Sequence, residues 1–197
     1  PEARPAPSAD PDWEDVRRRL QASADPQARH ARLFVLGSPL CAPSPALADY
    51  GAVSFPSGTG LLAGAADLMH RVHTDFEYVP EYSTIATPLA RLLADRRGVC
   101  QDFAHVAVGC LRSLGLAARY VSGYLETLPP PGREPLRGAD AAHAWFSVWL
   151  PDTGWFDFDP TNDQVPRDQH IAVAWGRDYS DVTPLKGVVY GSGGHQM

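Results

Sequence analysis

The 197-residue chain has few cysteines and no long apolar run, and each shortage excludes a class of protein. Its three cysteines, at positions 41, 100 and 110, form no C-x-x-C pair, which argues against a disulfide-built secreted domain. No run of about 18 apolar residues exists, so we expect no membrane-spanning helix and no membrane partner. Basic residues (17) are outnumbered by acidic ones (23) and form no stripe, so nucleic acid is not an expected partner.

The remaining composition is that of an ordinary globular domain, with 44% hydrophobic and 20% charged residues. We expect residues 1–197 to form a single domain in which residues 1–30 are an N-terminal lead with a short helix. The N-terminus lacks an apolar signal core, so the expected compartment is the cytoplasm. The chain begins with Pro1 instead of Met, so we expect a processed or excised fragment, in which a signal or a whole domain could be missing.

Hydrophobic periodicity predicts helices in the first part of the chain and antiparallel strands in the second, which is the α+β class. Asp10-Pro11 resembles a helix N-cap followed by proline at the first helical position. The tail is interpreted as irregular, with apolar patches at 171–175 and 188–190. The predicted helices cover about 11–21, 61–74, a segment from 88, and 100–114; the predicted strands cover 118–125, 143–150 and 155–159.

Cys100 lies at the first turn of a predicted helix that Gly115 ends. A thiol attacks only as a thiolate, and the positive end of a helix dipole favours that form. An imidazole from elsewhere in the fold can take the proton. Cys110 falls on the apolar stripe of the same helix and is interpreted as a core residue, and Cys41 as incidental in a Pro-rich loop. Cys100 is therefore the predicted nucleophile.

His143 is the candidate base because it begins a predicted strand directly after a loop. Its second ring nitrogen needs an acceptor that holds the tautomer, which an Asp or Asn normally supplies. The strands 143–150 and 155–159 should pair as a hairpin, which brings Asp159 close to His143. Asp157 lies on the same strand, two residues nearer the turn, and stays a second candidate.

Other interpretations of these residues were weighed. A Cys-His-Asp set can bind zinc, but no C-x-x-C or H-x-x-x-H pair supports a metal site, so neither a metal nor a cofactor is predicted. Trp145 is mainly a core residue that could also form a wall of the cleft beside His143. The loop 127–142 leads into His143, and we expect it to gate access.

Three ordered motifs resemble the transglutaminase-like superfamily, especially its bacterial cysteine protease and amidase members. They place a Cys at a helix start, a His on a strand and an Asp before Pro-Thr. The resemblance covers roughly residues 30–190, which gives a core of 31–190, and bacterial members often have an upstream β-rich domain that this chain lacks. The motifs are GVCQDFAH (98–105), AHAW (142–145) and GWFDFDPT (154–161); the stretches 119–124 and 176–185 are also similar.

The resemblance implies a papain-like α+β fold with the nucleophile at the N-terminus of a central helix packed on an antiparallel sheet. It also implies a triad of Cys100, His143 and Asp159, and so favours Asp159 over Asp157 by analogy.

The residues that stabilise the oxyanion are less defined by the sequence. The backbone N–H of Cys100 is the expected first donor. Family enzymes use an aromatic or polar donor upstream of the cysteine, for which Tyr78 is our candidate. Gln101 and Asp102 flank the nucleophile and are candidates for shaping the pocket.

These residues predict a cysteine enzyme that transfers the acyl group of a peptide or protein substrate through a thioester. Resolution by water would make it a protease or amidase, and resolution by an amine acceptor a transglutaminase. We expect hydrolysis, as in similar prokaryotic enzymes. The alternative is a catalytically silent binding or scaffold module, since a domain can keep its fold after it has lost its catalytic function. The oligomeric state is not indicated.

Overall fold

The structure is a computed structural model that describes residues 9–127, 136–138 and 142–183. It confirms the α+β class: helices come first and the four-stranded sheet follows. The elements are α1 Trp13–Ala22, α2 Pro26–Arg32, α3 Pro45–Ala52, α4 Leu61–Asp75, β1 Glu77–Tyr78, α5 Leu89–Asp95, β2 Arg97–Gly98, α6 Cys100–Ser113, β3 Ala118–Leu125, β4 His143–Leu150, β5 Gly154–Phe158, β6 His170–Gly176 and α7 Tyr179–Val182.

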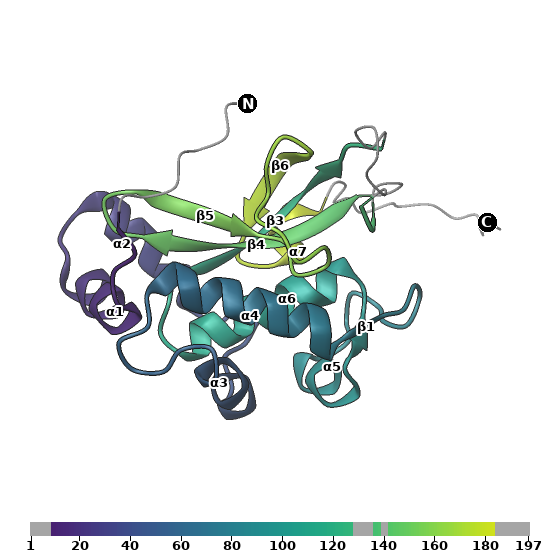
Figure 1. The fold of residues 1–197 in the computed structure, drawn as a ribbon, viewed down its shortest axis with the longest axis horizontal. Coiled ribbons are helices and arrows are strands. Elements are labelled where there is room, and N and C mark those ends of the chain that lie inside the picture. The colour runs from purple at the N-terminus through teal and green to yellow at the C-terminus, as the bar shows by residue number, and fades with distance from the viewer. Residues whose placement is uncertain (1–8, 128–135, 139–141, 184–197) are drawn as a thin grey trace, which may run out of the picture.

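The main sheet has the strand order β5-β4-β3-β6, and all its neighbours are antiparallel. Figure 1 shows this sheet lying over α4 and α6, with α3 and α5 on the far side of these helices. The predicted hairpin is confirmed, because β4 and β5 pair from Leu150 opposite Gly154 to Phe146 opposite Phe158. A separate parallel pair, β1 and β2, places Tyr78 opposite Gly98, just before α6.

Helix α6 is the central element, because it packs against the sheet on one side and against α3, α4 and α5 on the other. The apolar stripe predicted one buried face, but every residue from Asp102 to Arg112 is buried. The polar residues Asp102, His105 and Arg112 are therefore inside the protein, where each needs a hydrogen-bond partner. The small residues of the helix, such as Gly109, let the flanking elements approach closely.

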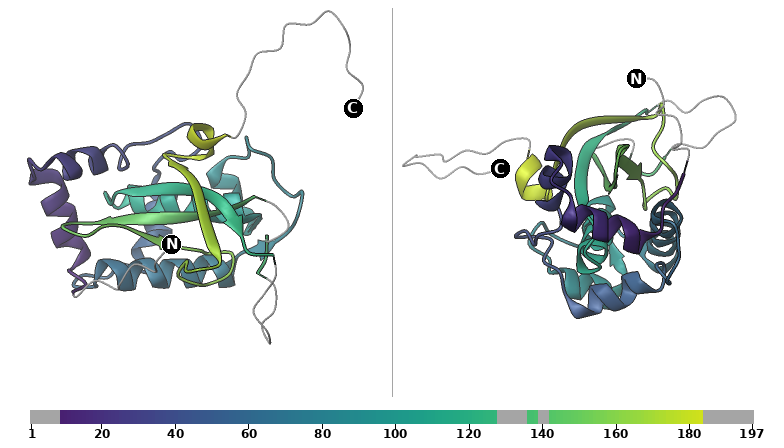
Figure 2. Two further views of the ribbon diagram at one scale, coloured as in Figure 1. Left: turned by 90° about the horizontal axis from the view of Figure 1, so that it is seen from above. Right: turned by 90° about the vertical axis from the view of Figure 1, so that its left-hand side faces the viewer.

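The N-terminal helices belong to the packed unit. Trp13 and Val16 of α1 contribute to the main core. Leu20 joins Ala28 and Phe34 in a second cluster, which packs against Trp149 of β4. Figure 2 shows α1 and α2 together at one end of the sheet.

Asp10 does not cap the helix that directly follows it. Its carboxylate oxygens accept hydrogen bonds from the backbone N–H groups of Leu62 (2.8 Å) and Ala63 (2.9 Å), at the start of α4. The N-cap of α4 is Gly60, which has no side chain to bond these groups. Asp10 is therefore a helix cap, as the sequence predicts, but it caps α4 and not the helix that follows it.

Strand β6 contradicts the prediction of an irregular tail. It adds to the edge of β3, where Leu125 lies opposite His170, and the register shifts between Ser122 and Gly123. Three of its residues, Ile171, Val173 and Trp175, are exposed apolar residues. Short-range patterning missed the strand because its pairing partner lies some 50 residues earlier in the chain.

Some sequence-based expectations fall on parts that the structure does not describe. Of the loop expected to gate access, residues 128–135 and 139–141 lie outside the described residues, as does the chain beyond 183. Within the described ranges, none of the helices has the length and apolar character needed to cross a membrane.

The buried guanidinium of Arg112 connects distant segments, so we expect its loss to destabilise the fold. It donates to the backbone carbonyls of Phe34 (2.9 Å), Ala118 (2.9 Å) and Arg177 (2.6 Å) and to Ser38 Oγ. Arg112→Met removes the donor from these buried acceptors, of which the Phe34 carbonyl keeps only the Ala118 N–H (3.2 Å), so the free energy of unfolding should fall by about 3 kcal/mol. Urea denaturation measures this loss.

The matched control is Arg91→Met, which removes an exposed guanidinium paired with Asp95. An exposed ion pair contributes little, so this variant should unfold close to wild type. Equal destabilisation of the two variants would contradict the role given to Arg112.

Candidate active site

Cys100 is the first residue of α6 and is partly exposed. The preceding Val99 offers no side-chain cap, and the Asp102 carboxylate instead accepts the backbone N–H of Val99 (2.8 Å). Asp102 folds back onto Gly98, where a Cβ would lie 2.7 Å from the Asp102 Cβ, so this position needs glycine. Cys100 thus begins a 14-residue helix whose first backbone N–H groups have no partner within the helix.

The other two cysteines are structural. Cys110 is fully buried on α6, and burial raises the pKa of its thiol to about 12. Cys41 is also fully buried, and burial raises its pKa strongly. Its sulfur lies 3.7 Å from the backbone carbonyl of His105, so Cys41 is a core residue and not an incidental loop residue.

His143 begins β4, and its side chain is fully buried against Asp159. Its Nε2 lies 2.9 Å from Asp159 Oδ2. A carboxylate only accepts, so Nε2 carries the proton and Nδ1 is the free position of the neutral ring. Nδ1 has no hydrogen-bond partner among the described residues. This is the tautomer that a histidine base requires.

The Cys100 sulfur lies close to the His143 ring. Burial lowers the pKa of His143, but its hydrogen bond to Asp159 and the neighbouring Cys100 raise that pKa to about 9. Cys100 also packs against a small buried cluster that includes Tyr120 of β3 and Ala144, the residue that follows His143. The imidazole is thus positioned between a carboxylate on Nε2 and a thiol, and it favours holding a proton.

Asp159 follows β5 in a turn whose backbone groups point at its own side chain. Its Oδ1 accepts the N–H groups of Thr161 (2.9 Å) and Asn162 (3.3 Å), as aspartate does when it caps a turn. A backbone bridge to Gln164 closes the turn. Burial alone would raise the pKa of Asp159, but hydrogen bonds from His143 and a second histidine, His170, hold it well below its usual range.

The two aspartate candidates have different partners in the structure. Asp157 accepts a hydrogen bond from Ser147 Oγ on β4, and Asp159 contacts His143. The fully buried Trp145 is a core residue that lies beside His143, with ring centroids 6.1 Å apart, and its role as a wall of the cleft stays a prediction.

The candidates for the oxyanion and the pocket have different surroundings. Tyr78 is partly buried on β1, and its ring packs edge-on against Phe103 of α6. Gln101 is partly exposed next to the nucleophile. Asp102 is buried, accepts from Ser83 and Val99, and so holds the start of α6 in place. Tyr78 and Gln101 stay predictions as oxyanion or pocket residues, whereas Asp102 has a clear capping role.

Sequence reasoning missed three residues at this site. His170 Nε2 lies 3.0 Å from Asp159 Oδ2, the oxygen that His143 also contacts. Asn162 Nδ2 donates to the same oxygen (2.8 Å). The backbone of Gly138 approaches His143 so closely that a Cβ would lie 2.7 Å from Nδ1. Asn162 directly follows the Asp-Pro-Thr motif, so its place in the sequence could have identified it. His170 and Gly138 are brought to the site by tertiary structure.

The same cluster has the donor atoms of a metal site. One ligand atom each from His143, Asp159 and His170 lie within 4.8 Å of one another. Two imidazoles and one carboxylate form a donor set that zinc or iron accepts. Each atom is already engaged, however, since both Nε2–H groups donate to Asp159. Metal ligation and the hydrogen-bonded pair therefore exclude one another.

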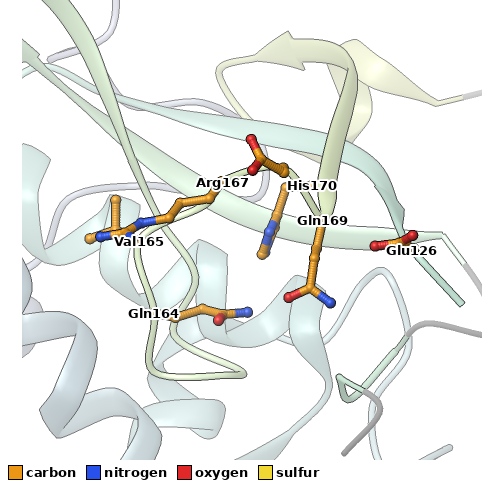
Figure 3. A pocket seen from close by; sticks show the side chains of 7 residues that line it. Glu126, Gln164, Val165, Arg167, Gln169 and His170 are labelled. Carbon is orange, nitrogen blue, oxygen red and sulfur yellow. The ribbon is translucent and has the colours of Figure 1, made fainter. Parts of the chain in front are cut away.

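A cavity of about 570 Å³ lies next to the site, and His170 is the residue of the cluster that lines it. Figure 3 shows the His170 imidazole among side chains of the segment after β5. The lining includes Gln164, whose Nε2 is buried without a partner among the described residues. The lining residues are Glu126, Gln164, Val165, Arg167, Asp168, Gln169 and His170.

Comparisons with known proteins agree on one family. The family model of the transglutaminase-like superfamily matches residues 56–160, a span that includes all three candidate triad residues. An uncharacterized protein of Mycobacterium tuberculosis, Rv2569c, is 49% identical over 149 residues, which cover 74% of this chain and 48% of the relative. The chain thus spans about half the length of that relative.

Two further similar proteins carry functional descriptions. A protein-glutamine gamma-glutamyltransferase of Pseudomonas aeruginosa is 32% identical over 179 residues, covering 86% of this chain and 26% of that protein. The crystal structure of a candidate cysteine protease from Cytophaga hutchinsonii superposes with a TM-score of 0.65 at 27% identity. The superposition covers 78% of this chain and 49% of the Cytophaga chain.

Proposed function

The chain belongs to the transglutaminase-like superfamily, and we propose that it is a cysteine enzyme that transfers the acyl group of a peptide or protein substrate. Cys100 is the nucleophile, His143 the acid and base, and Asp159 the residue that orients His143. One observation carries the proposal. Asp159 occupies Nε2 of a buried His143 and leaves Nδ1 without a partner among the described residues, with the Cys100 sulfur near the ring.

The proposed reaction has two halves. The Cys100 sulfur attacks the amide carbonyl, and the backbone N–H at the start of α6 stabilises the oxyanion. The C–N bond breaks as His143 gives its proton to the leaving amine, and a thioester remains on Cys100. Water then attacks the thioester and gives one proton to His143. The C–S bond breaks, which releases the carboxylic acid and restores Cys100 as a thiolate beside protonated His143.

Water is the acceptor that we propose, which makes the enzyme a protease or amidase. The two similar proteins with functional names differ in the acceptor that the name implies, since one is a gamma-glutamyltransferase and the other a candidate cysteine protease. An amine would resolve the same thioester with the same three residues. Adding a primary amine to a turnover assay and weighing the products measures how the thioester divides between water and amine.

The proposal is tested first by the reactivity of the thiol, which needs no substrate. At about pH 6 an unperturbed cysteine is about 0.3% thiolate, so it reacts slowly with iodoacetamide. An imidazole that holds the proton should make Cys100 react about 10-fold faster or more in the folded protein than in the same chain in urea. Mass spectrometry of peptic peptides gives the rate at each cysteine.

Cys41 and Cys110 are the internal controls, because burial should make both slower in the folded protein than in urea. A Cys100 that reacts no faster folded than unfolded would refute the activated thiol and with it the proposed enzyme. We expect Cys100 to react faster in the folded protein than in urea, and Cys41 and Cys110 to react more slowly in the folded protein than in urea.

A further inference from the structure

A second imidazole contacts the aspartate of the candidate triad. His170 is the first residue of β6 and is 8% exposed. Its Nε2 lies 3.0 Å from Asp159 Oδ2, and the Nε2 of His143 lies 2.9 Å from the same oxygen. Because a carboxylate only accepts, both rings donate their Nε2–H to Oδ2. One oxygen thus receives hydrogen bonds from two buried histidines.

The rings around Asp159 are packed as one unit. The His170 ring is edge-on to Trp145, with centroids 5.3 Å apart and planes at 89°. Trp145 also lies beside His143, and the two histidine side chains that contact Asp159 are almost fully buried. A hydrophobic residue at position 170 would fill this space without burying a ring nitrogen, so packing alone does not explain a histidine there.

Asp159 needs such a partner because the sheet does not hold it. The ladder between β4 and β5 ends at Phe158, and Asp159 lies beyond it in the turn. The backbone donors of that turn bond Oδ1 and leave the direction of Oδ2 to side chains. Oδ2 is the oxygen that His143 uses. Besides His143, Asn162 Nδ2 (2.8 Å) and His170 Nε2 (3.0 Å) bond Oδ2. These two side chains therefore help to fix the orientation of His143.

We propose that His170 is a positioning residue of the active site, which holds Asp159 Oδ2 against Nε2 of His143. It acts through Asp159, while the nucleophile and base remain Cys100 and His143. Strand β6 thereby becomes part of the catalytic unit, since its pairing with β3 brings His170 to the site. This inference rests on the proposed function.

The test uses two variants that separate bulk from hydrogen bonding. His170→Phe keeps a ring of similar size and removes the donor, so Cys100 should be alkylated at about pH 6 about 10-fold more slowly than in wild type. His170→Gln keeps an N–H donor near the position of Nε2 and should react within about 3-fold of wild type. Gln169→Ala, which changes the same cavity without contact to Asp159, should equal wild type.

A double-mutant cycle separates positioning from a general structural effect. If His170 acts through Asp159, His170→Phe should change nothing further in an Asp159→Asn background. Additive losses in the double variant would overturn the proposal. The proposal would also be overturned if Cys100 were alkylated as fast in His170→Phe as in wild type. That outcome would not contradict the proposed enzyme function.

Two other outcomes also overturn the inference. One equivalent of zinc in the purified protein, lost in His170→Phe, would make the cluster a metal site instead. A wild-type Cys100 that is no more reactive folded than in urea would refute the triad and His170's role in it together.

Discussion

Cys100→Ala should lower kcat/KM by at least about 10⁴-fold while the protein stays folded. Removal of the sulfur removes the atom that forms the thioester, and no other described cysteine can replace it, since Cys41 and Cys110 are fully buried. The side chain of Cys100 is only partly buried at a helix start, so alanine should be accommodated there without a large loss of stability. Turnover of a peptide substrate and urea denaturation measure the two effects.

Cys110→Ala is the matched control, on the same helix and of the same chemistry. Its sulfur packs in the main core, so this variant should lose about 1–2 kcal/mol of stability and keep its turnover per folded molecule. Cys100→Ala should thus lose activity without stability, and Cys110→Ala the reverse. Substantial turnover by Cys100→Ala would refute the nucleophile.

Asp159→Asn should lower kcat/KM by about 10⁴-fold through the tautomer of His143. The Oδ1 position faces the backbone N–H groups of Thr161 and Asn162, which can only donate. The amide oxygen must therefore take that position, and the NH₂ group faces His143 and His170. For its Nε2 to accept a hydrogen bond from this NH₂ group, neutral His143 must carry its proton on Nδ1. Nδ1 is the nitrogen that should receive the proton of Cys100.

A second readout of this variant is the pH dependence of turnover. The acid step needs protonated His143, whose pKa of about 9 depends on the Asp159 carboxylate. Wild-type activity should therefore persist up to about pH 9 and fall above it. Without the carboxylate the pKa of His143 decreases, so the residual activity of Asp159→Asn should fall at a lower pH.

Asp157→Asn is the control for that substitution, since Asp157 bonds Ser147 on the same hairpin and does not contact His143. It should keep near wild-type turnover and an unchanged alkaline limb. Equal losses in the two variants would contradict the assignment of Asp159.

Local patterning predicted much of the fold. The spacing of apolar residues predicted α4 and α6 within about one or two residues at each end, and β3 and β4 at their observed bounds. The hairpin followed from two strands and a four-residue turn, and it brought Asp159 near His143. These features depend on contacts between residues close in the chain, which the sequence displays directly.

The failures share a physical cause. Strand β6 pairs with β3 across a long connection, and no local period marks it. Asp10 caps α4, some 50 residues away, because α1 and α4 pack side by side. The burial of Arg112 on a helix expected to be half-exposed arises from the elements packed on both sides of α6.

The candidate site divides in the same way. The sequence by itself determined that Cys100 starts a helix, that His143 starts a strand, and that an aspartate ends the hairpin. Only the tertiary structure decided that Asp159 and not Asp157 contacts the imidazole, and that His170 shares its carboxylate. The reason is that residue type and local period define which groups are available, whereas the direction of a hydrogen bond depends on the strand pairing and turn geometry that orient each side chain.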